Sequence, residues 1–163
     1  METAITEHIA DLERRVAALE ARLEPENPQP AALALIDSLK ANTDLVDGAV
    51  TFGGVVDTGG RHYEYEWTRP THWVTDSEWE EEISRLSALA NPLRGEIMRR
   101  LLTSPATVTE LVEEHIASSP GTAYHHLSAL QAAGWVTKHD GSFAIPPARV
   151  VPLMAIITAC EAH

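Results

Sequence analysis

Residues 1–24 contain the most restrictive pattern in the sequence, an apolar seam whose spacing alternates between four and three residues. The seam consists of Ile5, Ile9, Leu12, Val16, Leu19 and Leu23. This repeat is typical of a coiled coil, because it keeps one narrow apolar stripe facing a partner helix. Two a positions are β-branched and two d positions are leucine, which favours a parallel dimer. The alternative is a single amphipathic helix folded onto its own chain.

Prolines end this coiled-coil segment. Pro25, Pro28 and Pro30 cannot continue a helix, so residues 25–30 are expected to form a stiff linker. The chain of 163 residues has room for one or two small domains. We therefore expect the coil to stand apart from whatever domains follow it.

Residues 31–75 predict a middle element, with a helix over 31–45 and a hairpin with strands over 49–56 and 61–68. Gly53-Gly54 in the first strand indicates a bulge or a close backbone approach. Aromatic side chains alternate along the second strand and, with one tryptophan beyond it, offer a speculative ligand pocket. These candidate ligand residues are Tyr63, Tyr65, Trp67 and Trp73. The alternative for this aromatic face is simply a buried core.

Residues 76–163 predict a series of short helices followed by a hairpin and a last helix. Ser77 and Glu80 have the spacing of a capping box, Pro92 suits the first turn of a helix, and Thr107 or Thr109 can cap another. The remaining signals are Ser118-Ser119-Pro120 at a helix start, Gly134 at its end, Asp140-Gly141 in a hairpin turn over 135–145, and an apolar helix over 148–160. The predicted fold class is mainly α with small β-hairpins (α+β).

Two separated runs in this region carry a family resemblance. The run from Leu86 to Arg94, followed by Ile97 and Leu101-Leu102, is similar to the first helices of ArsR-type bacterial regulators. The run from His126 to Val136 resembles the recognition-helix exit and wing entry of the same family. The resemblance covers about residues 83–160 and implies a winged helix-turn-helix DNA-binding domain.

The resemblance implies a dimeric transcription regulator that binds double-stranded operator DNA. A recognition helix from about Ser119 to Ala133 would enter the major groove, and the wing over 135–145 would lie on the backbone. The candidate DNA-binding residues are Ser118, Ser119, Thr122, Tyr124, His125, Gln131, Lys138 and Arg149. In the family, the position of His125 often carries a basic residue and that of Tyr124 is usually small and polar.

The charge of the chain restricts how it can bind DNA. Twelve Lys and Arg against 24 Asp and Glu give a net charge of −12, which argues against non-specific coating of nucleic acid. From Ser118 to Arg149 the formal sum is only +1, so the DNA face would be a local feature. His126 is interpreted as a histidine at the edge of the core, bonded to backbone, with a DNA contact as the alternative. For His125 the two roles stay open.

The sequence offers little for metal binding or catalysis. A single cysteine, Cys160, excludes an intrachain disulfide, and with His163 it supplies only two metal donors. His62, Glu64 and His72 form a second candidate group, for which a solvated strand face is the alternative. No phosphate-binding glycine loop and no nucleophile elbow are present. We predict no metal, no cofactor and no enzyme activity.

The expected partners are operator DNA and a second copy of the chain. The last helix carries dimerisation candidates Leu153 and Ile157, which the family resemblance pairs with the helix around residues 83–90 across a two-fold axis. A small apolar effector or a protein partner is the alternative role, in a module with little DNA affinity of its own. The chain shows neither a membrane span nor a secretory signal, so a cytoplasmic location without membrane contact is expected.

Overall fold

The computed structural model describes residues 12, 14–16 and 31–162. Residues 12 and 14–16 are helical, and both seam residues among them, Leu12 and Val16, are exposed. The rest of the predicted coil, namely Ile5, Ile9, Leu19 and Leu23, and the linker over 25–30 lie outside the described residues. Coiled-coil pairing therefore stays a prediction from the sequence.

The chain divides after Val46 into two compact units. Helix α2 (Ala31–Ala41) belongs to the first unit, whereas the hairpin belongs to the second unit together with the winged helix. The expected middle element of residues 31–75 is thus split between the two units. The physical reason is that the hairpin packs on the last helix of the chain, a contact that sequence spacing does not reveal.

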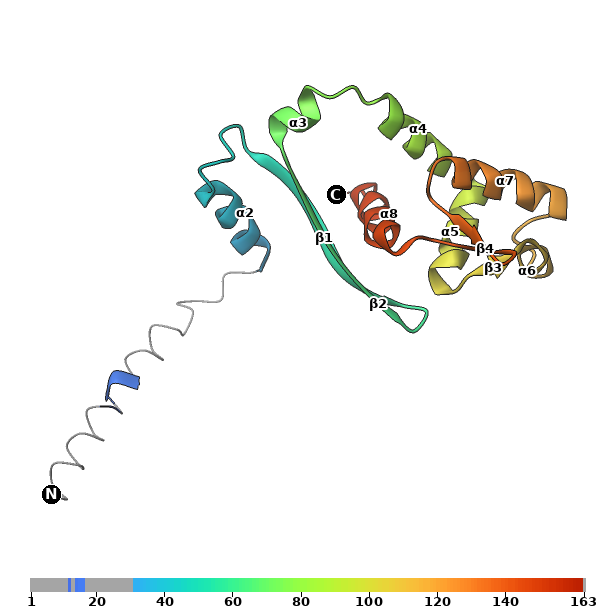
Figure 1. Cartoon of the computed structure of the whole chain (residues 1–163), viewed down its shortest axis with the longest axis horizontal. Helices are drawn as coiled ribbons and strands as arrows, with labels where there is room; N and C mark the ends of the chain where they lie inside the picture. Colours follow the sequence, from blue (N-terminus) through green and yellow to red (C-terminus); the bar gives the residue numbers. More distant parts are fainter. Residues whose placement is uncertain (1–11, 13, 17–30, 163) are drawn as a thin grey trace, which may run out of the picture. The chain divides into compact units, whose positions relative to one another are not determined.

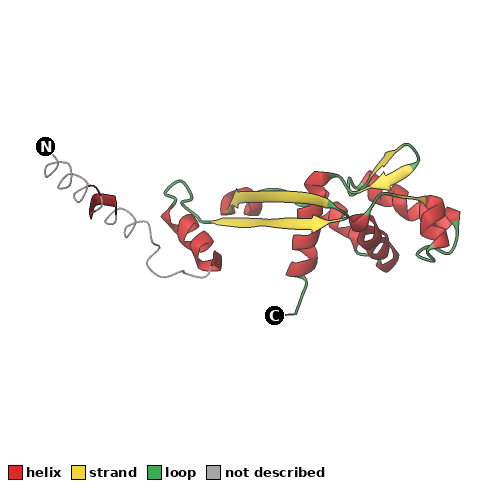
Figure 2. Ribbon diagram, turned by 90° about the horizontal axis from the view of Figure 1, so that it is seen from below, coloured by secondary structure: helices red, strands yellow, loops and turns green. Residues whose placement is uncertain are grey.

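The hairpin consists of two long antiparallel strands, β1 (Ala49–Thr58) and β2 (Arg61–Pro70) (Figure 2). Gly59 and Gly60 form its turn with φ values of 58° and 70°, as a tight two-residue hairpin requires. The register is continuous, so no bulge forms at Gly53-Gly54. The other expectation, a close backbone approach, is confirmed at Gly53, because a Cβ there would lie 2.9 Å from the carbonyl oxygen of Tyr65.

Two short helices connect the hairpin to the rest of the second unit: α3 (Thr71–Thr75) and α4 (Glu80–Leu89). The predicted capping box of Ser77 and Glu80 is wrong, since α4 begins after Trp79 without a side-chain cap. Ser77 Oγ instead donates to the carbonyl of Val74 at 3.0 Å, and Trp79 Nε1 donates to the same carbonyl at 2.7 Å. These bonds hold the loop to the end of α3.

The remaining elements form a winged helix-turn-helix (Figure 1). In chain order they are α5 (Pro92–Thr103), β3 (Ala106–Thr107), α6 (Val108–Glu113), α7 (Pro120–Ala132), β4 (Thr137–His139), β5 (Ser142–Ala144) and α8 (Pro147–Ala159). The three short strands form one sheet in the order β3-β5-β4. Asn91, Thr107 and Ser119 cap α5, α6 and α7, and Thr107 forms a full capping box with Glu110. The predicted fold class is confirmed.

The core of the second unit lies where α5, α6, α7, α8 and the small sheet meet. Its largest fully buried side chains are Phe143, Ile97, Met98, Leu101, Leu111, Leu127, Leu130, Val136 and Val150. The hairpin joins this core through Tyr63, which is 9% exposed, and through a hydrogen bond from Thr58 Oγ1 to the Leu102 carbonyl. Within the described residues, no helix is long and apolar enough to span a membrane.

Two adjacent glycines test how the hairpin turn docks on α5. A Cβ on Gly59 would lie 1.8 Å from the carbonyl oxygen of Thr103, whereas a Cβ on Gly60 would meet nothing within 4 Å. Both substitutions share the cost of a left-handed backbone, about 1–2 kcal/mol. We expect Gly59→Ala to lower the free energy of unfolding in urea by about 1–3 kcal/mol more than Gly60→Ala, because only Gly59→Ala creates a clash. Equal losses would show that this docking contact is absent in solution.

Candidate nucleic-acid interface

Helix α7 has one buried side and one open side. Ala123, Leu127 and Leu130 are fully buried and recur at spacings of four and three residues, so they fix which side of the helix faces the core. On the rest of the helix surface, Tyr124 is 52% exposed, and His125 and Gln131 are exposed as well. Tyr124, His125 and Gln131, all three proposed from the sequence as DNA-binding residues, therefore lie on the open side of the helix.

The start of α7 gathers three hydroxyl groups. Ser119 Oγ accepts a hydrogen bond from the Thr122 backbone N–H at 3.2 Å and lies 2.9 Å from Thr122 Oγ1. Ser118 Oγ donates to the same Thr122 Oγ1 at 3.4 Å. Small hydroxyls at a helix N-terminus suit phosphate oxygens or base edges. The structure thus brings together three of the residues proposed from the sequence.

The wing adds a basic group next to this helix. Lys138 lies on β4, and its Nζ is 5.4 Å from the ring centroid of Tyr124 on α7 and 5.4 Å from that of Phe143 on β5. The turn of the wing places Asp140 and Gly141 at φ values of 48° and 83°, which matches the tight turn predicted for this dipeptide. Tyr124 and Lys138 therefore share one surface formed by helix and wing.

Gln131 and Arg149 lie away from the hydroxyl group cluster, which consists of Ser118, Ser119 and Thr122. Gln131 is exposed near the end of α7, two helical turns beyond Tyr124. Arg149, at the start of α8, places its guanidinium 5.3 Å from the ring centroid of Trp135, which follows α7. Trp135 Nε1 in turn donates to the carbonyl of Arg85 on α4 at 2.8 Å. Arg149 thus lies near the C-terminal end of α7.

His126 lies at the edge of the core beside His125 and the guanidinium of Arg94. Partial burial lowers the pKa of its imidazole, and His125 and the guanidinium of Arg94 lower it further. The rings of His125 and His126 meet edge to face with centroids 5.2 Å apart. The expected backbone hydrogen bond is not formed in the described part of the chain. His126 therefore favours the neutral form, so it adds little charge to this surface.

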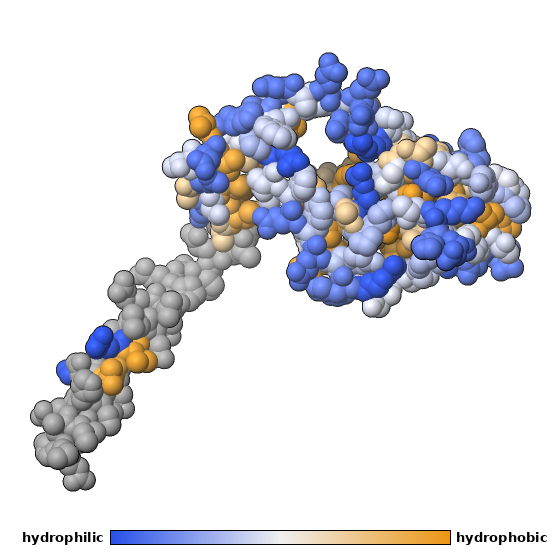
Figure 3. All heavy atoms as spheres, viewed as in Figure 1, coloured by the Kyte–Doolittle hydropathy of each residue, from blue (hydrophilic) through white to orange (hydrophobic). Residues whose placement is uncertain are grey.

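Carboxylates are absent from the sequence between Glu114 and Asp140, the stretch that supplies α7 and most of the wing. Acidic groups concentrate on α4, which begins with Glu80, Glu81 and Glu82, and on α6. The upper edge of the second unit in Figure 3, over α4 and the loop before it, is correspondingly hydrophilic. At the end of α6, the C-cap residue Glu114 forms a bidentate ion pair with Arg100, at 2.6 and 2.8 Å, which lowers the pKa of that carboxyl. The negative charge of the chain is thus kept off α7.

Sequence reasoning omitted one residue of the open side of α7, Ser128. It lies one helical turn beyond Tyr124 and His125 and is partly exposed. The helical period predicts this exposure, because position 128 lies four residues after Tyr124 and three before Gln131, which are both exposed. Ser128 extends the polar surface of α7 along the helix.

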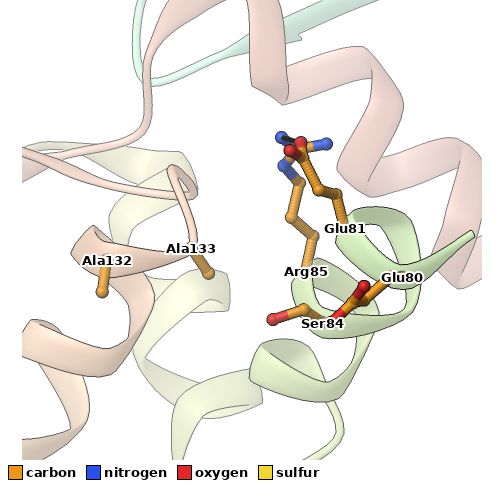
Figure 4. A pocket seen from close by; sticks show the side chains of 6 residues that line it. All are labelled: Glu80, Glu81, Ser84, Arg85, Ala132 and Ala133. Atoms are coloured by element: carbon orange, nitrogen blue, oxygen red, sulfur yellow. Dashed lines mark hydrogen bonds and ion pairs between the residues drawn. The ribbon is translucent and has the colours of Figure 1, made fainter.

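A polar pocket of about 490 Å³ lies between α4 and the end of α7 (Figure 4). Its walls are Glu80, Glu81, Ser84 and Arg85 from α4 and Ala132 and Ala133 from the end of α7. Arg85 pairs with Glu81 at 2.7 Å. Two glutamates against one arginine give this pocket a net negative charge, unlike the open side of α7.

The other residues singled out from the sequence fall into separate places. Tyr63 is buried and Tyr65 partly buried, whereas Trp67 and Trp73 are 42% and 61% exposed. Of the dimerisation candidates on α8, Ile157 is 60% exposed, but Leu153 is 4% exposed and belongs to the core of its own chain.

The histidines considered for a metal do not converge. His62 lies 2.6 Å from Asp57 and 3.0 Å from Glu64, which together raise the pKa of its imidazole. His72 instead pairs with Asp47, with Nδ1 2.9 Å from the carboxylate. Among the described residues no group of three or more His, Cys, Asp or Glu side chains is placed to hold a metal ion.

Comparison with known proteins identifies the helix-turn-helix segment. Residues 91–138 match the family model described as bacterial regulatory protein, arsR family. The matched segment runs from the cap of α5 to β4, so it contains the hydroxyl group cluster, the open side of α7 and Lys138. No curated protein and no solved structure matches the chain.

The lowered pKa of His126 has a consequence for stability. Because the folded pKa lies below the unfolded value near 6.5, the unfolded chain binds more protons between the two values, so stability falls as pH decreases through that window. We expect His126→Gln to lose less stability than the wild type between pH 7 and pH 5, as measured by urea unfolding. His139→Gln, an exposed wing variant, should follow the wild type. Parallel curves for His126→Gln and the wild type would contradict this assignment.

Proposed function

Residues 91–138 form an ArsR-type helix-turn-helix, the domain of a DNA-binding transcription regulator, and from this premise we propose that the protein binds operator DNA as a dimer. Helix α7 enters the major groove, and the wing over 135–145 lies along the phosphate backbone. Operator binding by two symmetric copies follows from the usual geometry of this domain.

The observation that carries this proposal is the absence of Asp and Glu between Glu114 and Asp140 in a chain of net charge −12. Phosphates repel carboxylates at close range, so a groove-binding helix in so acidic a chain is favoured when it carries none of them. The same stretch supplies the open side of α7 and the lysine of the wing. A helix serving only as scaffold would need no such exclusion.

The residues of this surface divide into two proposed roles. Ser118, Ser119 and Lys138 contact phosphates, because hydroxyls at a helix start and a wing cation suit the backbone. Thr122 and His125, one turn apart on the open side of α7, contact base edges. Tyr124 holds Lys138 against the helix. Gln131 and Arg149 make supporting contacts with DNA near the C-terminal end of α7.

Dimerisation is proposed through two separate surfaces. The seam of residues 5–23 pairs as a parallel coiled coil. The second surface is formed by α8 and α4, where Ile157, Ile83 and Leu86 are 60%, 54% and 40% exposed. A parallel coil has its two-fold axis along its own length, so both surfaces can share one axis. Leu153 supports α8 from within the core and is not proposed as a contact.

An effector is proposed to act at the hairpin. Trp67 and Trp73 leave apolar surface exposed there, and the turn of the hairpin is hydrogen-bonded to the end of α5. A small ligand or a protein partner on this surface would contact the same unit as the DNA-binding helix. This role adds to operator binding and does not replace it.

The two proposed roles on the DNA face predict different effects of substitution on DNA binding. Lys138→Ala should weaken binding to all duplexes alike and reduce the slope of log K against log salt by about one, because one phosphate contact is lost. His125→Ala and Thr122→Ala should instead change which sequence is preferred, by about 1–3 kcal/mol at the contacted base pair. Fluorescence anisotropy with a specific and a random duplex across a salt series measures both effects.

Two controls accompany these variants. Arg61→Gln removes a cation from the hairpin and should leave DNA affinity unchanged, whereas Thr122→Ser keeps the hydroxyl and should keep the preference. Unaltered binding in Lys138→Ala, His125→Ala and Thr122→Ala together would contradict the proposed orientation of α7.

The coil seam predicts a dimer that weakens when the seam is removed. Deletion of residues 1–24, or Leu12→Asp with Leu19→Asp, should leave a dimer that dissociates on dilution, because only the α4 and α8 surface remains. Ala10→Asp with Ala17→Asp places the same charges outside the seam and should behave as the wild type. Sedimentation equilibrium measures the dissociation constant of the dimer. An unchanged constant in the deletion variant would exclude the coil as a dimer contact. A tetramer of the full-length chain would show that the two helices of each coil come from different dimers.

A further inference from the structure

One face of the hairpin carries a continuous row of aromatic rings. The register pairs Phe52 with Trp67 and Gly54 with Tyr65, so these side chains point to the same side of the two strands. Phe52 stacks on Tyr65 with ring centroids 5.8 Å apart, and Tyr65 stacks on Trp67 at 6.1 Å. Interplanar angles of 23° and 19° keep the rings nearly parallel. The row is therefore ordered before any ligand arrives.

Helix α8 and the core cover only the half of this face nearest the turn. There Tyr63 is buried in the core, and Gly54 lies against Val151 of α8. The other half extends past these contacts, and its apolar side chains stay open: Val50 is 61% exposed and Trp67 42%. Trp73 of α3 follows at 61%. The open half thus presents two indoles in a region where they contribute little to the core.

Arg69 lies between these two indoles. Its guanidinium carbon is 3.9 Å from the ring centroid of Trp67 and 5.3 Å from that of Trp73, while the residue itself is partly buried. Its hydrogen bond goes from Nη1 to the carbonyl of the adjacent Thr68, at 3.2 Å. Across the described residues it forms no ion pair, whereas Arg85, Arg99 and Arg100 each pair with a glutamate.

We propose that the open half of this face, formed by Val50, Phe52, Trp67, Arg69 and Trp73, binds a planar aromatic carboxylate. The ring of such a ligand can stack on an indole, as aromatic pairs with offset geometry do, and its carboxylate can accept two hydrogen bonds from the guanidinium. Charge complementarity selects this class. A cation is repelled by Arg69, and a neutral ring leaves its donors unpaired.

The site rests in one respect on the proposed function, because it supplies the effector expected at the hairpin. The turn of the same hairpin reaches α5 through the bond from Thr58 to the Leu102 carbonyl. Helix α5 packs against α7, so a ligand on the open half binds the same packed body that presents the DNA face. Ligand binding itself needs no DNA, and the two can be measured apart.

Isothermal titration calorimetry of the full chain with 1-naphthoate tests the site. We expect binding by the wild type, at least tenfold weaker binding of the neutral 1-naphthamide, and at least tenfold weaker binding of 1-naphthoate by Arg69→Gln. Trp73→Ala should bind about threefold or more weakly, and because Trp73 is largely exposed its thermal unfolding should match the wild type. Arg61→Gln is the matched control and should bind 1-naphthoate as the wild type does. Arg61 lies on the same face, with its guanidinium carbon 5.8 Å from the ring centroid of Tyr63.

The outcomes separate this site from the proposed function. No heat up to millimolar 1-naphthoate, equal affinity for acid and amide, or equal affinity of Arg69→Gln and wild type would each overturn the site while leaving operator binding intact. A change of sedimentation in Arg69→Gln or Trp73→Ala would overturn it too, by assigning the face to self-association. Binding as expected with unchanged operator affinity would keep the site and refute only its role as effector site.

Discussion

The packing of three apolar side chains of α7 in the core determines which surface this protein can present to a partner. Ala123, Leu127 and Leu130 are fully buried, so the rotation of the helix about its axis is fixed by the core. Everything on the opposite side, from the hydroxyls at the helix start to His125, is open as a consequence. The Arg100–Glu114 pair ties the end of α6 to α5, the Thr107 capping box fixes the start of α6, and the Ser119 cap fixes where α7 begins.

Charge is the second constraint, and it acts through the separation of the carboxylates from α7. An acidic chain can bind DNA only where its carboxylates are withdrawn, and here they gather on α4 and α6 while α7 carries none. The short Debye length at physiological salt, about 8 Å, limits how far the distant carboxylates act. Local geometry therefore decides the interaction more than net charge does. The same principle applies to Arg69, a cation without an ion pair among the described residues, which lies among aromatic rings on an acidic protein.

The features predictable from sequence are those with a local physical cause. Thr107 and Ser119 cap helices, and Gly134 ends α7 at a φ of 73°, because each acts on residues within one turn of itself. The failures have non-local causes. Ser77 was expected to cap α4 but bonds to the end of α3. The hairpin was expected in a separate middle element but packs on α8, which lies far from it in the sequence, so no local pattern signals the contact. Exposure of Trp67 beside burial of Tyr63 could not be read from alternation either, since both lie on one face.

The central claim is that the open side of α7 reads DNA sequence on behalf of a two-fold dimer. The most direct measurement is selection of bound duplexes from a random library by the full-length chain, followed by sequencing. The account predicts an enriched inverted repeat whose half-sites lie about one helical turn, roughly 10–10.5 base pairs, apart or a multiple of it. Recovery of no common sequence, or of a single unrepeated half-site, would contradict it.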